Sequence, residues 1–249
     1  MTLSRRRLIG IGATGLLLPG CDRLNRSEGF RSVLEQAEAL HMRSQRLIGG
    51  NEALAREFSE ADMSPVFRAN GNTQVADSAY RSHAARGFAD WALQVGGLVE
   101  RPLSLPLAAL QAIEQREQIT RHDCVEGWSA IGKWQGPRLS SVLDLAGLQK
   151  QARYIVFHCA DRFGDVPYYE SIDLIDAFHP QTILAWRMNE RPLSEAHGAP
   201  LRLRVERQLG YKHAKYLMRI EARSSLAGLY GGRGGYWEDK SDYHWYAGI

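Results

Sequence analysis

Residues 121–128 read RHDCVEGW, and no other stretch of this sequence is as informative. A single cysteine, Cys124, follows an arginine, a histidine and an aspartate and precedes a Gly-Trp turn. A cysteine beside cationic groups is biased toward the thiolate, which is the form that attacks electrophiles or binds soft metals. A lone cysteine is more often a small buried apolar side chain. The residues alone leave both interpretations open.

The other two cysteines, Cys21 and Cys159, do not extend this stretch into a metal motif. The sequence has no CxxC or HExxH spacing of a zinc site and no CxxCH of covalent haem. Three cysteines are also too few for a disulfide scaffold. A thiol-based reductase that pairs Cys124 with Cys159 remains open, and it requires their Cα atoms to lie within about 7 Å of each other.

A second group of cationic residues lies downstream, where residues 197–205 read HGAPLRLRV and residues 210–215 read GYKHAK. A predicted turn and two strand ends bring histidine, arginine and lysine together here. This composition suits an anionic ligand such as a phosphate. The alternative is a solvated basic edge of a sheet.

Strands and helices alternate irregularly along the rest of the chain. Segments rich in β-branched or aromatic residues predict strands at residues 91–95, 154–159, 183–188, 201–205 and 216–222. Helix-start and helix-stop residues predict short helices at residues 105–113, 139–145 and 171–178. This order does not fit a regular parallel α/β array. The sequence therefore predicts one α+β domain over residues 61–249, with several mixed β-sheets and short helices.

The first 20 residues have the layout of an export signal, with a basic part, an apolar run and small residues. Within them, SRRRLIG (residues 4–10) resembles a twin-arginine signal, the address of proteins that are exported already folded. The apolar run is shorter than the roughly 20 residues of a membrane-spanning helix. LPGC (residues 18–21) resembles a lipoprotein cleavage box, although Pro19 replaces the usual small residue. Cleavage without lipid on Cys21 therefore remains open.

Two further features of the N-terminal part say less about function. Residues 10–15 match the GxGxxG dinucleotide fingerprint, but no strand precedes them and no helix follows within a βαβ unit, so we reject a dinucleotide site. Residues 21–60 are predicted to hold an amphipathic helix, over about residues 30–48, and a linker. We expect this helix to pack on the domain or to space it from a membrane.

Composition limits the class of partner. The chain has 249 residues, 44% of them hydrophobic, which is enough to bury a large core. The formal charge is +3, from 31 Lys and Arg against 28 Asp and Glu. Without the three arginines of the signal, 28 basic residues stand against 28 acidic ones. A neutral body gives no support to binding of nucleic acid, which depends on a clustered basic surface.

Five motifs taken together resemble a known family. They are RHDCVEGWS (residues 121–129), HPQT (residues 179–182), MN with PL (residues 188–189 and 192–193), HGAPLR (residues 197–202) and KHAK (residues 212–215). In combination they resemble the molybdopterin-binding domain of the sulfite oxidase family, from about Pro65 to the C-terminus. Exported bacterial members, including the catalytic subunit of the periplasmic methionine sulfoxide reductase, are more similar than the haem-bearing animal enzymes.

The resemblance implies a molybdenum-molybdopterin cofactor (Mo-MPT) and assigns residues to it. Cys124 matches the thiolate ligand of the molybdenum, and Tyr243 matches the active-site tyrosine of sulfite oxidases. Arg202 matches the arginine on the pterin phosphate, and either Cys159 or Asp161 matches a pterin contact. The other residues that match cofactor-binding positions are Asn70, His197, His213, Ala214 and Lys215.

The implied activity is that of an exported molybdenum oxidoreductase, which moves an oxygen atom to or from a small or protein-borne substrate, sulfur compounds among them. Sulfite itself is disfavoured because Ala69 stands where sulfite oxidases have a substrate-binding arginine, with Arg68 one residue away. The sequence has no haem or flavin motif, so electrons would be exchanged with a separate membrane or periplasmic cytochrome.

The resemblance also implies a location and an oligomeric state. We expect a protein exported by the twin-arginine machinery into the periplasm, and anchored to the inner membrane if Cys21 is lipidated. We expect a monomer, because the chain lacks the immunoglobulin-like dimerisation domain of sulfite oxidases. The alternative function is a non-catalytic periplasmic lipoprotein that uses the same fold as a binding module.

Overall fold

A computed structural model of the chain describes residues 27–249. The twin-arginine stretch and Cys21 lie outside the described residues. The chain divides into two units, Met1–Ile48 and Gly49–Ile249. In the first unit, helix α3 (Glu28–Gly49) confirms the predicted amphipathic helix. None of the helices in the described part of the chain is both long enough and apolar enough to cross a membrane.

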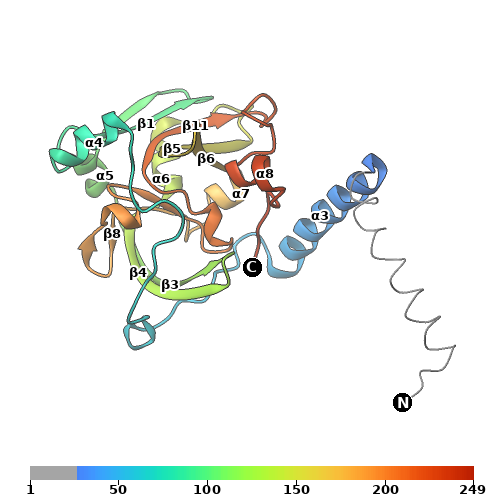
Figure 1. Cartoon of the computed structure of the whole chain (residues 1–249), viewed down its shortest axis with the longest axis horizontal. Coiled ribbons are helices and arrows are strands. Elements are labelled where there is room, and N and C mark those ends of the chain that lie inside the picture. Colours follow the sequence, from blue (N-terminus) through green and yellow to red (C-terminus); the bar gives the residue numbers. More distant parts are fainter. Residues whose placement is uncertain (1–26) are drawn as a thin grey trace, which may run out of the picture. The chain divides into compact units, whose positions relative to one another are not determined.

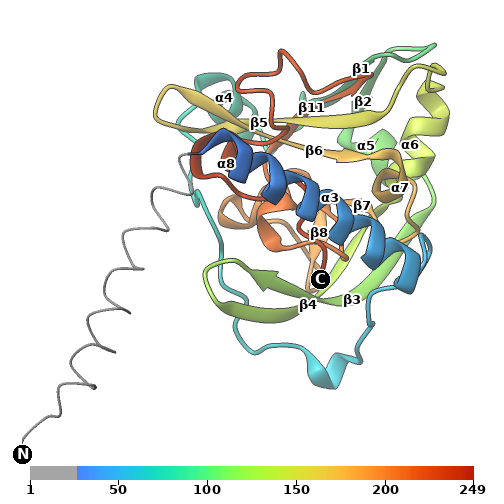
Figure 2. The same ribbon diagram turned by 90° about the vertical axis from the view of Figure 1, so that its right-hand side faces the viewer.

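The second unit is built on three β-sheets (Figures 1 and 2). The largest has the order β2-β1-β11-β5-β6, and it is mixed because β1 runs parallel to β11 while the other neighbours are antiparallel. A four-stranded sheet has the order β3-β4-β8-β9 and a two-stranded sheet pairs β10 with β7; both are antiparallel. In Figure 2 the five-stranded sheet lies at the top and the β3–β4 hairpin at the bottom.

The strands have the following bounds: β1 (Ala92–Gly97), β2 (Leu103–Pro106), β3 (Gln115–Cys124), β4 (Trp128–Pro137), β5 (Tyr154–Phe163), β6 (Val166–Asp173), β7 (Ile183–Ala185), β8 (Arg187–Met188), β9 (Arg191–Pro192), β10 (Arg202–Arg204) and β11 (Leu217–Arg223). The helices, all short, are α4 (Ser78–Ala85), α5 (Leu107–Ala112), α6 (Leu139–Ala146), α7 (Leu174–Ala177) and α8 (Tyr236–Ser241), with 3-10 turns η1 (Glu60–Asp62), η2 (Glu195–His197) and η3 (Gly210–Lys212). The α+β class predicted from the sequence is confirmed.

The main hydrophobic core lies on the five-stranded sheet. Ile155 and Phe157 of β5 and Ile220 of β11 are fully buried there, together with Val142 and Leu143 of α6. The apolar residues of α6 recur at helical spacing, so one face of the helix closes the core. A smaller cluster surrounds Trp134 of β4. The ends of β3, β5 and β6 contribute side chains to the site described below.

The sequence did not predict the long β3–β4 hairpin, in which ten residue pairs run from Gln115↔Pro137 to Cys124↔Trp128. Burial alternates along β3, but the buried side chains near its middle are polar: Gln118, Thr120 and His122. Apolar alternation, the usual sign of a strand, is therefore missing. Gly127 has a φ of +84° and completes the turn by donating its N–H to the Cys124 carbonyl at 3.0 Å.

Two further boundaries differ from the expectation. Residues 171–173 belong to β6, and helix α7 begins only at Leu174, because the Asp173 side chain accepts from Asp176 N and caps it. Residues 49–60, predicted as part of a linker, belong to the second unit: Phe58 N donates to Ile119 O at 2.9 Å and Ala55 N donates to Gln181 Oε1 at 2.8 Å.

Replacement of Asp77 by alanine is expected to lower the free energy of unfolding by about 1 kcal/mol. The Asp77 carboxylate accepts a hydrogen bond from Tyr80 N at 2.9 Å and caps helix α4, which follows the loop that carries Asn70. Asp77→Asn keeps the cap and serves as the control. Urea unfolding measures both variants; equal losses in the two variants would contradict the capping role.

Candidate active site

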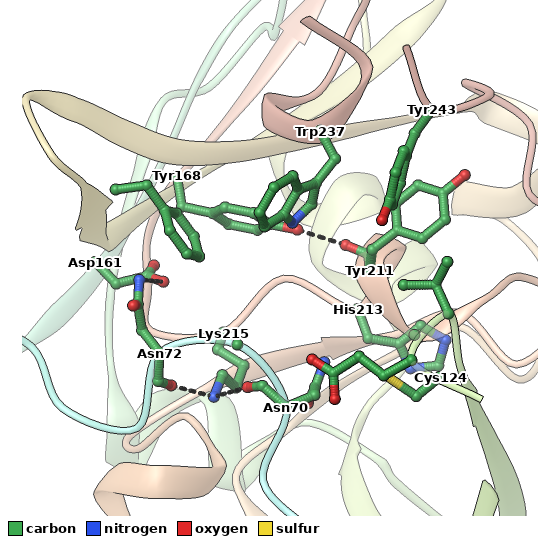
Figure 3. Close-up of a pocket in the computed structure, with 15 residues that line it drawn as sticks. Asn70, Asn72, Cys124, Asp161, Tyr168, Tyr211, His213, Lys215, Trp237 and Tyr243 are labelled. Carbon is green, nitrogen blue, oxygen red and sulfur yellow. Dashed lines mark hydrogen bonds between the residues drawn. The ribbon is translucent and has the colours of Figure 1, made fainter. Parts of the chain in front are cut away.

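A cavity opens where the end of β3, the β5–β6 hairpin, η3 and the C-terminal segment meet (Figure 3). It encloses about 680 Å³ of empty space including its mouth. Its lining includes six of the residues that the sequence assigned to the site: Asn70, Cys124, Asp161, His213, Lys215 and Tyr243. The cavity therefore assembles residues that are up to 173 positions apart in the sequence, from Asn70 to Tyr243.

Cys124 ends strand β3 and is almost buried, on the same inner face as His122. Burial raises the pKa of the Cys124 thiol above its ordinary value. Arg121 points away and pairs with Asp123, Nε to Oδ2 at 2.9 Å. The expectation that neighbouring cationic groups favour the thiolate is therefore wrong for the unliganded chain. A metal ion would reverse this, because a coordinating thiol is deprotonated by the charge of the metal.

His122 lies two residues before Cys124 on β3 and supports this end of the cavity. The sequence did not predict this role. The ring is fully buried, and its Nδ1 lies 3.0 Å from Arg204 Nη1. Burial and the charges of Arg204 and Arg202 lower the pKa of His122 well below its ordinary value, so the ring is neutral. Its centroid lies 5.1 Å from that of His213. Gly210 permits this packing, since a Cβ there would meet the His122 ring at 2.4 Å.

Lys215 ties the Asn70 loop to the rest of the site. Its Nζ donates to three backbone carbonyls, those of Asn70 at 2.6 Å, Asn72 at 2.5 Å and Ala196 at 3.0 Å. Burial, and secondarily the charge of Arg202, lowers the pKa of Lys215 to about 7. The three carbonyls occupy the three N–H donors of the ammonium group. Lys215 thus fixes the position of Asn70 at the cavity.

Of the two alternatives for the pterin contact, Cys159 and Asp161, only Asp161 lines the cavity. Asp161 lines the cavity and accepts a hydrogen bond at Oδ2 from Asn72 Nδ2 at 3.0 Å (Figure 3). Cys159 belongs to the main hydrophobic core, where burial raises the pKa of its thiol well above the ordinary value. Both Cys124 and Cys159 are free thiols in the structure. A dithiol reductase has no support here, since the two thiols are not joined and only Cys124 lines the cavity.

Arg202, His197 and Ala214 lie behind the cavity rather than in its lining. Arg202 is fully buried, with its guanidinium 5.1 Å from the Trp134 ring, and it donates to His197 O at 3.1 Å and to His213 O at 3.4 Å. His197 contacts Ser194 Oγ and Phe67 O through its two ring nitrogens. Ala214 is buried and accepts from Leu203 N through its carbonyl. These residues hold together the segments on which the cavity is built.

Aromatic side chains form the opposite wall. Trp237 stacks on Tyr243 with centroids 5.8 Å apart, and Tyr211 meets Tyr243 edge-on at 5.0 Å. Tyr168 donates from its hydroxyl to Tyr211 O at 2.6 Å, and Phe163 completes the wall. Of these, only Tyr243 was predicted from the sequence. The others carry no local motif, because the wall forms only when β6, η3 and α8 are brought together.

The residues around the cavity fit a polar organic cofactor with a metal. The buried polar atoms without a hydrogen-bond partner include Asp161 Oδ1, Arg202 Nε and His213 Nδ1. Each such atom costs about 1–3 kcal/mol unless a ligand satisfies it. Cys124 offers a single soft sulfur ligand. No group of three or more His, Cys, Asp or Glu side chains that could hold a metal exists among residues 27–249. A metal at Cys124 would therefore take its other ligands from the cofactor.

Asp161 is expected to make the free energy of unfolding of the cofactor-free chain depend on pH. Burial raises the pKa of Asp161 from 3.8 to about 6. Because the unfolded carboxyl ionises first as the pH rises, we expect the folded state to lose up to about 3 kcal/mol between pH 4 and pH 6. Asp161→Asn should remove this part of the dependence. Urea unfolding between pH 4 and pH 7 measures it, and an unchanged profile in the variant would refute the expectation.

Comparison with known proteins identifies relatives over most of this region. The family model described as "Oxidoreductase molybdopterin binding domain" matches residues 81–227. A putative protein-methionine-sulfoxide reductase subunit YedZ1 of Azospira oryzae is 42% identical over 177 residues, which cover 71% of this chain and 62% of that protein. The protein-methionine-sulfoxide reductase catalytic subunit MsrP of Xanthomonas axonopodis is 38% identical over 141 residues, or 52% of this chain and 44% of that protein.

A solved structure shares the fold. The sulfane dehydrogenase SoxCD of Paracoccus pantotrophus superposes with a TM-score of 0.53 at 20% identity, over 61% of this chain and 41% of that chain. The chain thus spans between two-fifths and two-thirds of the length of these proteins.

Proposed function

Because this chain belongs to the family of oxidoreductases with a molybdopterin-binding domain, we propose that it reduces methionine sulfoxide side chains of proteins outside the cytoplasm. The chain is a molybdopterin-dependent oxidoreductase and its cofactor is molybdenum-molybdopterin. Two relatives are named for reduction of protein methionine sulfoxide, which supports the choice of substrate.

The observation that carries the proposal is the charge of the cavity lining. Among the described residues no arginine lines it, and Arg68 is exposed elsewhere. Lys215 is the only basic side chain in the lining besides neutral His213, and its ammonium donors are taken by three carbonyls. Such a site does not compensate the charge of sulfite. It suits a neutral sulfoxide, whose methyl and sulfur can contact the rings of Trp237 and Tyr243.

Four residues in or behind the cavity would hold the bound cofactor. Cys124 would supply the thiolate ligand to the metal, and Arg202 would pair with the pterin phosphate through its unpartnered Nε. Asp161 and His213 would pair with polar atoms of the pterin. When bound, the cofactor supplies the two-electron transfer of an oxygen atom. The Tyr243 side chain points into the cavity and would donate a hydrogen bond to the sulfoxide oxygen (Figure 3).

The reaction also needs electrons from elsewhere. Conversion of a sulfoxide to a thioether and water consumes two electrons and two protons. We propose a membrane or periplasmic cytochrome as the electron donor. The signal-like residues 1–20 support export by the twin-arginine machinery, and a lipid on Cys21 would raise the effective concentration of a membrane-bound donor.

The proposal is tested with the chain purified after expression with molybdate. A viologen dye reduced by dithionite serves as electron donor, and oxidised calmodulin or a methionine sulfoxide peptide serves as substrate. Sulfite with ferricyanide as acceptor is the matched comparison. We expect sulfoxide-dependent oxidation of the dye and no sulfite oxidation. Turnover of sulfite without turnover of sulfoxide would overturn the proposal.

A further inference from the structure

Beside the aromatic wall lies a buried cluster of three charged residues, Lys212, Glu170 and Glu238. Lys212 Nζ lies 2.5 Å from Glu170 Oε2 and 2.5 Å from Glu238 Oε1. All three side chains are fully shielded from solvent. None of them lines the cavity.

The charges of this cluster do not balance if all three groups are ionised. One ammonium would face two carboxylates, and an uncompensated buried charge is strongly unfavourable. The remaining oxygens, Glu170 Oε1 and Glu238 Oε2, have no hydrogen-bond partner. Both lie against Gly235, where a Cβ would meet them at 2.5 Å and 2.0 Å. A single proton between the two oxygens would satisfy both atoms and neutralise the cluster.

The cluster joins the three segments that form the aromatic wall. Glu170 follows Tyr168 on β6, and Lys212 follows Tyr211 and precedes His213 at the end of η3. Glu238 follows Trp237 on α8. Removing the cluster would remove the buried ion pair that joins α8, next to Trp237, to the segment that carries His213 and Lys215.

We propose that Lys212, Glu170 and Glu238 share one buried proton and act as positioning residues, which hold the aromatic wall of the cavity against its cofactor-binding segment. The titratable groups that face the cluster are Tyr168 from β6, Cys159 from β5 and Tyr211 from η3, whose ring centroid lies 5.9 Å from Lys212 Nζ. Burial, and then the charge of Glu238, raises the pKa of Glu170 well above its ordinary value, and, despite burial, the charges of Glu170 and Glu238 raise the pKa of Lys212.

The shared proton is tested by the pH dependence of unfolding. If the folded chain holds a proton that the unfolded chain releases, the ratio of folded to unfolded chain falls about tenfold for each pH unit. Glu238→Gln replaces the acid by a neutral amide, so its ratio should lack this tenfold fall between pH 6.5 and pH 8. Glu117→Gln is the matched control, because Glu117 also pairs with a lysine, Lys133, but is half exposed. Equal slopes in the wild type and Glu238→Gln would overturn the shared proton.

The positioning role is tested with the molybdenum-loaded protein, and this arm rests on the proposed function. We expect Glu238→Ala to raise the KM for a methionine sulfoxide peptide about tenfold at unchanged molybdenum content, and Glu238→Gln to keep it near the wild-type value. Equal KM values in wild type, Glu238→Ala and Glu238→Gln would overturn the positioning role. If no variant turns over sulfoxide, the proposed substrate is wrong while the pH slopes still report on the cluster.

Discussion

Cys124→Ser is expected to lower the rate of sulfoxide reduction by more than about a hundredfold. Loss of a partner that only supports a metal ligand typically costs 10–100-fold, and loss of the ligand itself should cost more. Serine is similar in size, but its hydroxyl is a hard donor where a sulfur-bound metal favours a thiolate. Steady-state kinetics with a viologen donor measure the rate, and the visible spectrum reports the loss of the thiolate–metal absorption.

Cys159→Ala provides the control for this variant. Cys159 is also a nearly buried free cysteine, but it lies in the hydrophobic core outside the cavity. We expect this variant to keep its metal and most of its activity. Full turnover by Cys124→Ser would show that Cys124 is not the metal ligand, and equal losses in both variants would point to a general effect of cysteine replacement.

Arg202→Met is expected to reduce retention of the cofactor at least tenfold. The guanidinium is fully buried, and its Nε lacks a partner in the protein. Burial and the neighbouring Arg204 lower the pKa of Arg202 to about 9, so a bound phosphate would supply the missing negative charge. Methionine keeps the volume of the side chain but offers no donor to a phosphate. Molybdenum and pterin content per chain, after gel filtration, measure the effect.

Arg202→Lys separates charge from geometry at the same position. Lysine keeps the positive charge but cannot donate to His197 O, His213 O and the phosphate from one planar group. We expect intermediate retention. If Arg202→Met retains the cofactor as well as the wild type does, Arg202 serves only to hold the two carbonyls.

Three strands of the five-stranded sheet, β1, β5 and β11, were predictable from the sequence, because they are rich in apolar and β-branched residues. Strands β2 and β6 were not predicted, and parts of both fell within predicted helices. The β3–β4 hairpin was not, because its buried face carries the polar network of Gln118 and His122. These side chains are paired with residues far along the chain, Glu206 and Arg204, and sequence spacing alone does not reveal such partners.

The residues of the site likewise fall into those that sequence motifs indicate and those that only the folded structure brings in. Cys124, His213 and Lys215 stand in short motifs, so the family resemblance proposes them as site residues, whereas it left Asp161 and Cys159 as alternatives. Trp237 and Tyr168 stand in no motif, and they reach the cavity only through the packing of α8 and β6. The sequence also left open whether Cys124 is a thiolate or a buried thiol, since burial, which raises the pKa of this thiol, is a property of the folded chain.

The central claim is that a molybdenum bound by a pterin is also bound by Cys124. X-ray absorption at the molybdenum edge counts the sulfur atoms around the metal directly. We expect three sulfur ligands in the wild type, two from the pterin and one from Cys124, and two in Cys124→Ser. The same number of sulfur ligands in both proteins, or no molybdenum in the folded wild type, would contradict the account.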